Sequence, residues 1–208
     1  MEDIIIYVLL LTSVIGLTVI IERGIALRVK RIIPPEVESA LETCRTSGDL
    51  PMLQGICAQH PSPLSRLLLL AAQRLDWPKE ENAGAMETAA RHELAKLERR
   101  LVILEIVVGV APLLGLVGTI YGLIELFGGL AQSGLGDNSA LAKGIALALN
   151  STLLGLLTAI PSLIAWSYYN KKVEGIAVEM AALCDGFLIR QYHDEPGTPL
   201  ENATARGH

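Results

Sequence analysis

Residues 111–131 read APLLGLVGTIYGLIELFGGLA, and this segment decides the fold. It is apolar enough for the interior of a bilayer, and as a helix it would rise about 31 Å, which matches the thickness of the hydrocarbon core. It also contains a proline, five glycines, a threonine and a glutamate, none of which a simple anchor requires. The segment therefore predicts a membrane helix that has a function besides anchoring the chain.

The rest of the 208-residue chain also indicates a membrane protein. Its residues are 51% hydrophobic and its mean hydropathy is +0.43, which is more apolar than an ordinary soluble domain. Apolar runs cover residues 4–21, 101–130 and 140–168, and each is close to or longer than the ~18–20 residues that cross a bilayer. Two acids, Glu2 and Asp3, precede the first run in place of a basic segment, and no cleavage signature follows, which favours a retained helix over a secretory signal. We predict an all-α polytopic protein with three transmembrane helices, the second and third extending into a cytoplasmic helical region.

Basic residues beside these runs predict the orientation. They follow the first run, precede the second and follow the third, whereas the other ends carry little positive charge. The positive-inside rule then places the N-terminus outside and the C-terminus in the cytoplasm. The basic residues are Arg23, Arg28, Lys30, Arg31, Arg99, Arg100, Lys171 and Lys172. The predicted segments are 1–22 (N-terminus and first membrane helix), 23–100 (cytoplasmic helical loop), 101–130 (second membrane helix), 131–140 (outer loop), 141–169 (third membrane helix) and 170–208 (cytoplasmic C-terminal helix and tail).

Prolines divide the predicted cytoplasmic loop into helices. The stretch SPLSRLLLLAAQRLDWP has Ser62 as an N-cap and Pro63 at the first helical position, and it ends at Pro78. No helix breaker separates Pro78 from the second apolar run. The sequence therefore predicts one continuous rod of about 50 residues, near 75 Å long, that enters the membrane.

The sequence carries no signature of catalysis, of a cofactor or of a metal site. Cys44, Cys57 and Cys184 are odd in number and lie on the predicted cytoplasmic side, so we expect no disulfide. The four histidines show no metal-ligand spacing, and no nucleophile elbow or phosphate-binding loop is present. We therefore expect a protein that is not an enzyme. The net charge of −5 also argues against a nucleic-acid partner.

Small residues form a stripe on each of the last two membrane helices. Gly115, Gly118 and Gly122 are spaced i, i+3 and i+7, and Ala111 lies one turn below. The third helix repeats the pattern with spacings of 4, 4, 3 and 4, at Gly144, Ala148, Thr152, Gly155 and Ala159. Small residues let membrane helices approach closely, so both stripes predict helix packing and, with the long rod, a homo-oligomer.

Polar residues within these stripes suggest an ion pathway. Thr119 lies about halfway along the second apolar run, and Thr152, preceded by Asn150 and Ser151, lies about halfway along the third. A lone membrane threonine usually bonds back to its own helix, but two at matching depth favour a narrow polar pathway. Glu125 lies about two turns toward the outer side from Thr119. It can either line the mouth of that pathway or simply reach the interface, and both interpretations stay open.

These residues carry a family resemblance. The segments APLLGLVGTIYGLIELF and GIALALNSTLLGLLTAIPSLIAWSYYNK resemble the MotA/TolQ/ExbB proton-channel family, in its three-helix ExbB/TolQ branch. The resemblance covers residues 101–172 well and the rest loosely. The matching motif positions are Ala111, Pro112, Gly115, Gly118, Thr119 and Gly122, then Gly144, Ile145, Ala146, Ala148, Leu149, Thr152, Gly155, Leu156, Ala159, Ile160 and Pro161.

The resemblance implies a stator subunit in the bacterial inner (plasma) membrane, with a periplasmic N-terminus and a cytoplasmic C-terminus. Such subunits form a pentamer whose pore holds an ExbD/TolR-like single-pass partner, and this partner supplies a membrane aspartate that the threonines face. The resemblance implies that the proton motive force then drives mechanical work in the periplasm through a TonB- or TolA-like protein, energising outer-membrane transport or envelope maintenance.

One position departs from the family pattern. TonB- and Tol-associated members often read GIAEAL, whereas this chain reads GIALAL with Leu147 at the acidic position. The resemblance therefore leaves open which coupled system the chain serves. A structural membrane scaffold without ion conduction is the alternative, in which the threonines and glycines only pack helices. Replacing a pore-facing threonine would separate the two functions.

Overall fold

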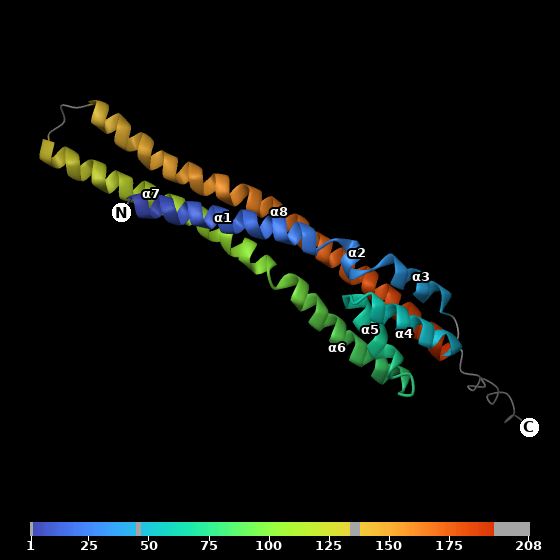
Figure 1. The fold of residues 1–208 in the computed structure, drawn as a ribbon. Helices are drawn as coiled ribbons and strands as arrows, with labels where there is room; N and C mark the ends of the chain where they lie inside the picture. The colour runs from blue at the N-terminus through green and yellow to red at the C-terminus, as the bar shows by residue number, and fades with distance from the viewer. Residues whose placement is uncertain (1, 45–46, 134–137, 194–208) are drawn as a thin grey trace, which may run out of the picture. The chain divides into compact units, whose positions relative to one another are not determined.

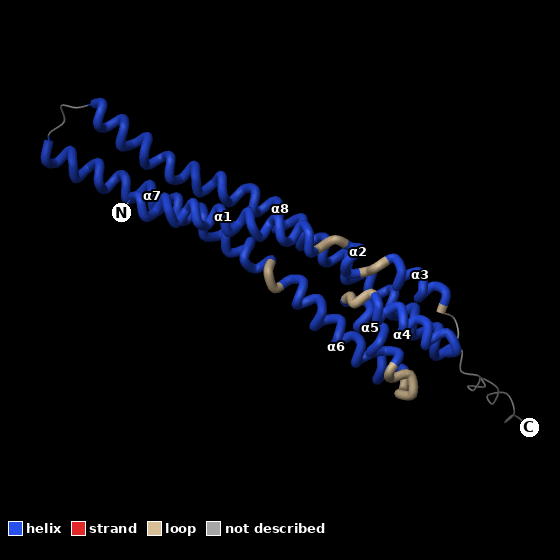
Figure 2. The backbone as a smooth tube through the Cα atoms, in the orientation of Figure 1, coloured by secondary structure: helices blue, strands red, loops and turns tan. Residues whose placement is uncertain are grey.

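A computed structural model describes residues 2–44, 47–133 and 138–193. Every regular element in these ranges is a helix (Figures 1 and 2). The elements are α1 (Glu2–Ala26), α2 (Val29–Ile32), α3 (Pro35–Thr43), the short 3-10 helix η1 (Ser47–Asp49), α4 (Leu50–Gln59), α5 (Pro63–Ala72), α6 (Lys79–Glu98), α7 (Leu101–Ser133) and α8 (Asn138–His193). The all-α fold class is confirmed.

Three of these helices are long and apolar enough to cross a membrane. The candidate spans are Ile4–Ala26 in α1, Leu101–Gly129 in α7 and Gly144–Tyr192 in α8. The number of membrane helices is therefore confirmed, and so is the continuation of the third, because α8 runs for 56 residues without a break. The predicted outer loop 131–140 is helical at both ends, and residues 134–137 lie outside the described residues, as does the tail 194–208.

The chain divides into two compact units, each of which combines two stretches of sequence. The membrane unit contains the chain up to Leu27 together with Leu97–Val173. The loop unit contains Arg28–Lys96 and the part of α8 that begins at Glu174.

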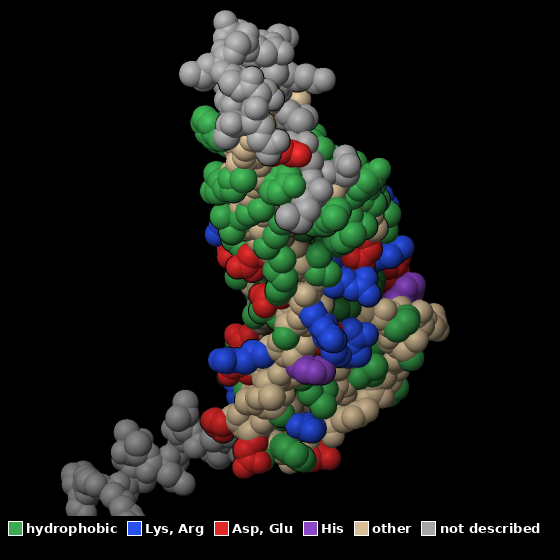
Figure 3. All heavy atoms as spheres, turned by 90° about the vertical axis from the view of Figure 1, so that its left-hand side faces the viewer, with side chains coloured by type: hydrophobic (Ala, Val, Ile, Leu, Met, Phe, Trp, Pro, Cys, Tyr) green, Lys and Arg blue, Asp and Glu red, His purple; other side chains and the backbone are tan. Residues whose placement is uncertain are grey.

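In the membrane unit, α1 packs along α7 and also contacts α8. A Cβ atom at Gly16 of α1 would lie 3.1 Å from the Ser162 Oγ of α8 and 3.3 Å from Val107 of α7, so the three helices meet at this glycine. Tyr169 Oη fixes α8 to α1 by donating to the Ile20 carbonyl at 2.8 Å. The outward faces carry large apolar side chains such as Leu113 and Ile164, and the face in Figure 3 shows the membrane-spanning stretches as largely hydrophobic. This surface suits contact with lipid.

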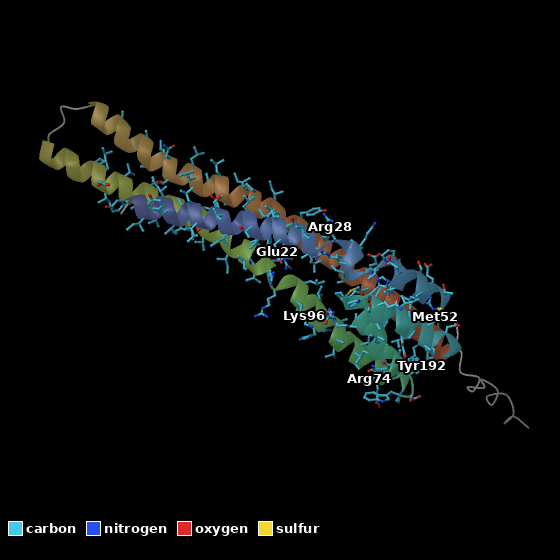
Figure 4. All side chains as sticks on the ribbon, in the orientation of Figure 1. Glu22, Arg28, Met52, Arg74, Lys96 and Tyr192 are labelled. Atoms are coloured by element: carbon cyan, nitrogen blue, oxygen red, sulfur yellow. The ribbon has the colours of Figure 1, made fainter. Side chains whose placement is uncertain are left out.

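The predicted continuous rod is wrong, because α6 ends at Glu98 and α7 begins only at Leu101. In an unbroken helix the Leu97 carbonyl would accept from the N–H group of Leu101. Instead it accepts from Arg23 Nη1 at 3.2 Å, and the buried Arg23 guanidinium is itself held by two bonds to Glu22. Arg100 pairs with the same Glu22 carboxylate, at the end of α1 where Figure 4 labels Glu22. Arg23, 74 positions away in the sequence, therefore occupies the Leu97 carbonyl that a continuous helix would have used for its own backbone hydrogen bond.

The loop unit has an aliphatic core built mainly from α3, α4, α5 and the last turns of α8, with Val37, Leu53, Leu68 and Phe187 almost fully buried. The predicted start of α5 is confirmed: Pro63 opens the helix, and the Ser62 hydroxyl accepts from the Ser65 N–H group at 3.1 Å. The other buried apolar residues of the loop unit are Ile32, Ile33, Ala40, Leu41, Cys44, Cys57, Leu64, Leu67, Ala71, Met86, Ile176, Met180, Cys184 and Leu188.

Tyr192, near the end of α8, fixes the turn between α5 and α6. Its hydroxyl lies 2.8 Å from the Trp77 carbonyl and 3.3 Å from the Arg74 carbonyl, and Figure 4 shows Tyr192 close to Arg74. The buried Asn82 amide donates to the same hydroxyl and to the Ala71 carbonyl. These bonds hold the two ends of the loop unit together.

The loop unit also buries an ionised carboxylate. Glu93 accepts from both Arg66 and Lys96 and is only 8% exposed. Burial alone would raise the pKa of this carboxyl, but the hydrogen bonds and charges of Arg66 and Lys96 hold the pKa below its usual value. The folded loop unit therefore depends on a paired, charged Glu93.

We expect Arg66→Met to lower the free energy of unfolding by about 1–3 kcal/mol at neutral pH, because it removes one partner of a buried charge. The pKa of Glu93 is lowered in the folded chain, so the stabilisation is fully present above the ordinary value of 4.5 and is lost as the pH falls through the lowered value. The difference between variant and parent should thus shrink in acid. Chemical unfolding of the detergent-solubilised chain, followed by circular dichroism, measures both quantities.

Arg91→Met is the matched control for this prediction. Arg91 pairs with Glu87 on the same helix as Glu93, but both side chains are largely exposed. Exposed pairs of this spacing contribute only about 0.3–0.5 kcal/mol. Equal losses in the two variants, or a loss in Arg66→Met that does not change with pH, would contradict the role of the buried ion pair.

Candidate functional site

The small-residue stripes of α7 and α8 pack directly on each other within one chain. A Cβ atom at Gly155 would lie 2.7 Å from the Ala111 carbonyl oxygen, and one at Gly115 would lie 3.1 Å from Thr152 Cα. These distances mean that backbone meets backbone. We call this contact the α7–α8 seam. It consists of Ala111, Gly115, Gly118 and Thr119 on α7, and of Ala148, Ser151, Thr152 and Gly155 on α8.

The seam continues toward the C-terminal end of α7 and the N-terminal end of α8. A Cβ atom at Gly118 would lie 2.6 Å from the Ser151 side chain, and one at Gly144 would lie 2.6 Å from the end of Leu126. Gly122 and Ala159 are buried as well. Because these stripes face each other inside one chain, they explain the folding of the membrane unit and are not by themselves evidence for contact between copies.

The two threonines meet in the middle of the seam. Their hydroxyl oxygens are hydrogen-bonded to each other across the helices. Thr119 Oγ1 also lies 3.2 Å from the Gly115 carbonyl of its own helix and 3.2 Å from the Ala148 carbonyl of α8. Thr152 Oγ1 lies 3.3 Å from that same Gly115 carbonyl. Both threonines are only half-buried in the single chain.

The number of protons limits what this pair can bind. Each hydroxyl has one proton and two lone pairs. One hydroxyl donates to the other, and the second donates to a backbone carbonyl, so both protons are used inside the chain. The pair therefore keeps free lone pairs and no free proton. It can accept a hydrogen bond from an outside group without losing an internal one.

Of the other residues predicted for the pathway, Ser151 lies in the seam, and Asn150 and Glu125 do not. Ser151 is buried against Gly118, whereas the Asn150 and Glu125 side chains are exposed. Among the motif prolines, Pro112 is half-buried inside α7 and Pro161 is exposed on α8. The side chain of Leu147 lies outside what the structure describes.

The sequence interpretation missed the cluster of Glu22, Arg23 and Arg100 at the end of the membrane unit. The arginines were assigned only as topology signals, yet Arg23 is buried and bonded to three acceptor atoms, two on Glu22 and one on Leu97. An acid directly before the first of these basic residues was the available signal. Among the described residues no cluster of three or more metal-binding side chains occurs.

Comparisons with known proteins agree on one family. The model of the MotA/TolQ/ExbB proton channel family matches residues 59–182 of this chain, a stretch that contains the whole α7–α8 seam. The chain is 31% identical over 203 residues to the Tol-Pal system protein TolQ of Pseudomonas aeruginosa, which covers 89% of this chain and 86% of that protein.

Two further relatives carry related names. The chain is 30% identical over 213 residues to a Synechocystis protein named as biopolymer transport protein ExbB-like 1, covering 96% of this chain and 80% of the relative. It is 31% identical over 148 residues to an ExbB homolog of Methanothermobacter thermautotrophicus, covering 71% of this chain. The aligned region spans about half of that third relative, 52% of its length.

Proposed function

Because this chain belongs to the MotA/TolQ/ExbB proton channel family, we propose that it is a stator subunit that couples a proton gradient to work outside the inner membrane. The observation that carries the proposal is the hydrogen-bonded pair of Thr119 and Thr152 in the middle of a membrane-spanning helix pair. A packing seam built only from small apolar residues would not need two hydroxyls at one depth. The pair provides polar oxygens inside the membrane to which a proton-carrying group can form a hydrogen bond.

The titrating carboxyl in this proposal comes from a partner chain. Neither α7 nor α8 has an acid near the hydroxyl pair, since Leu147 occupies the place of the acid found in some relatives. The partner is an ExbD/TolR-like single-pass chain with a membrane aspartate. The chain itself forms a homo-oligomer, a pentamer, around this partner, and a TonB- or TolA-like protein receives the output.

Both hydroxyl protons of the pair are already donated inside the chain, and this determines whether the pair binds the protonated or the charged form of the partner's carboxyl. A protonated carboxyl is a hydrogen-bond donor and can bond to a free lone pair of Thr119 or Thr152 with no internal change. A carboxylate can only accept hydrogen bonds. To bind it, one of the threonine hydroxyls would have to break a hydrogen bond that it donates inside the seam. The pair thus favours the protonated form of the aspartate, which releases its proton only after it has moved away. One charge that crosses ~100 mV supplies ~2.3 kcal/mol for such a step.

The orientation follows from the basic residues of the membrane unit. Arg23 lies in the last turn of α1 and Arg100 directly precedes α7, and by the positive-inside rule we assign that end to the cytoplasmic side. The outer ends of α7 and α8 then face the periplasm. Glu125 belongs to the periplasmic half of α7.

A reconstitution experiment tests the proposal. The chain is purified together with an ExbD/TolR-like single-pass partner and is placed in liposomes that contain a pH-sensitive dye. An imposed potential should drive proton uptake that requires both chains. Vesicles with both chains that take up protons no faster than empty vesicles would overturn the proposal.

The alternative function is a structural scaffold without ion conduction. It is supported by the internal satisfaction of both hydroxyl protons, since such a pair can serve packing alone. The scaffold predicts that replacement of either hydroxyl changes stability and leaves proton movement at the level of empty vesicles in parent and variant alike. The same reconstitution therefore decides between the two.

A further inference from the structure

Glu105 is an acid on the membrane surface of α7. It lies inside the span Leu101–Gly129, its side chain is exposed, and it has no hydrogen bond or ion pair with any described residue. The nearby Arg100 is paired with Glu22 instead. Acids on the membrane face of a helix are rare and usually serve a function, although the cost of burying them falls toward the surface. Glu105 therefore needs an explanation that packing does not give.

Glu105 lies on the same side of α7 as the hydroxyl pair. Residues 105, 112 and 119 are spaced by seven, and at 3.6 residues per turn Glu105 and Thr119 are only about 40° apart around the helix. Their separation along the axis is about 21 Å. Glu125, by contrast, lies about 120° away from Thr119 around the same helix. Only Glu105 shares a stripe with the pair.

The stripe between Glu105 and Thr119 contains a backbone carbonyl that lacks its usual helical donor. Pro112 lies inside α7 and has no N–H group, so the Val108 carbonyl one turn before it has no helical donor. Val108 is within about 60° of Glu105, in the next turn. Gly109 adds open space, since a Cβ atom there would meet no atom within 4 Å. A carbonyl without its helical donor and an uncovered stretch of backbone thus lie between the acid and the hydroxyl pair.

We propose that Glu105 is the residue that exchanges protons with water at the cytoplasmic end of the pathway, the end at which Arg100 lies. This inference rests on the proposed function. A proton released from the partner carboxyl passes along water on the stripe that holds the Val108 carbonyl. It binds the Glu105 carboxylate, which then gives it to bulk water and becomes charged again. No other bond forms or breaks.

The test compares proton uptake by liposomes that hold the chain and its proposed single-pass partner. Glu105→Gln removes the exchangeable proton site at nearly constant volume and should slow uptake at least about tenfold. Glu105→Asp keeps a carboxyl and should restore at least about a third of the parental rate, which a purely structural role would not predict. Glu98→Gln is the control, because Glu98 is an exposed acid outside the membrane span, and it should keep the parental rate.

The failures of this inference and of the proposed function are distinguishable. If Glu105→Gln keeps the parental rate while Thr119→Val loses it, the role of Glu105 is wrong and the function stands. If the parent itself moves no protons, the function fails and the inference fails with it. A second measurement does not depend on folding of a variant: dicyclohexylcarbodiimide, which modifies protonated carboxyls in membranes, should label Glu105 in the parent complex, as read by peptide mass spectrometry. Labelled complex with unchanged uptake would contradict the proposal.

Discussion

Thr119→Val and Thr152→Val are each expected to reduce partner-dependent proton uptake at least about tenfold while the chain still folds and assembles. Valine keeps the volume and shape of threonine and removes only the hydroxyl. Each change deletes the bond between the two helices that the hydroxyls form. A net loss of about 1 kcal/mol per hydrogen bond leaves the seam intact, because its backbone contacts remain. Dye-reported uptake in liposomes and elution of the complex in detergent measure the two effects.

Thr158→Val is the matched control. Thr158 is a half-buried threonine on α8, and its hydroxyl bonds back to the Leu154 carbonyl of its own helix at 3.0 Å. It lies outside the seam, so its replacement should leave uptake at the parental rate. Thr119→Ser, which keeps the hydroxyl, should retain most of the uptake. Equal losses in Thr158→Val and Thr119→Val would mean that any threonine replacement disturbs the helices, and the role of the pair would be lost.

Gly155→Leu is expected to prevent the membrane unit from folding. The first side-chain atom would lie 2.7 Å from the Ala111 carbonyl oxygen and 3.1 Å from Gly115 Cα, and both are backbone atoms that no rotamer change can move. Overpacking of flexible surroundings costs about 1–3 kcal/mol, so a clash with backbone should exceed that range. The variant should therefore yield little monodisperse protein, and the remainder should unfold at a much lower temperature in detergent.

Gly175→Leu provides the comparison on the same helix. A Cβ atom at Gly175 would meet no atom within 4 Å, and leucine is a better helix former than glycine. This variant should match or exceed the stability of the parent. If Gly155→Leu unfolds at the parental temperature, then the two helices do not contact each other through Gly155. If Gly155→Leu folds normally but fails to form an oligomer, the stripe serves contacts between copies and not within one chain.

Much of the membrane unit could be predicted from local patterns. Three apolar runs of sufficient length gave three membrane helices, because a backbone in lipid must satisfy its hydrogen bonds within each helix. The start of α5 was also predictable, since a Ser-Pro pair at an N-terminus acts within one turn. Matching depths of Thr119 and Thr152 indicated two hydroxyls in one layer of the membrane.

The features that the sequence did not reveal depend on residues far apart in the chain. The break between α6 and α7 comes from Arg23, which takes the Leu97 carbonyl from 74 positions away. Neither helix propensity nor a missing proline can signal such a competitor. Likewise, the small-residue stripes predicted packing but not the partner helix, and the structure shows them meeting inside one chain. The direct bond between the two threonines required the register of α7 against α8, which the spacing of residues within each helix does not fix.

The most direct test of the central claim is proton uptake by the double variant Thr119→Val/Thr152→Val. Liposomes that hold the chain and its proposed single-pass partner are given an imposed potential of ~100 mV. The initial rate is recorded for the parent, both single variants and the double variant. If the two hydroxyls act as one unit, each single variant loses nearly all uptake and the double variant is no slower than either. A double variant that takes up protons at the parental rate would contradict the claim that protons depend on the α7–α8 seam.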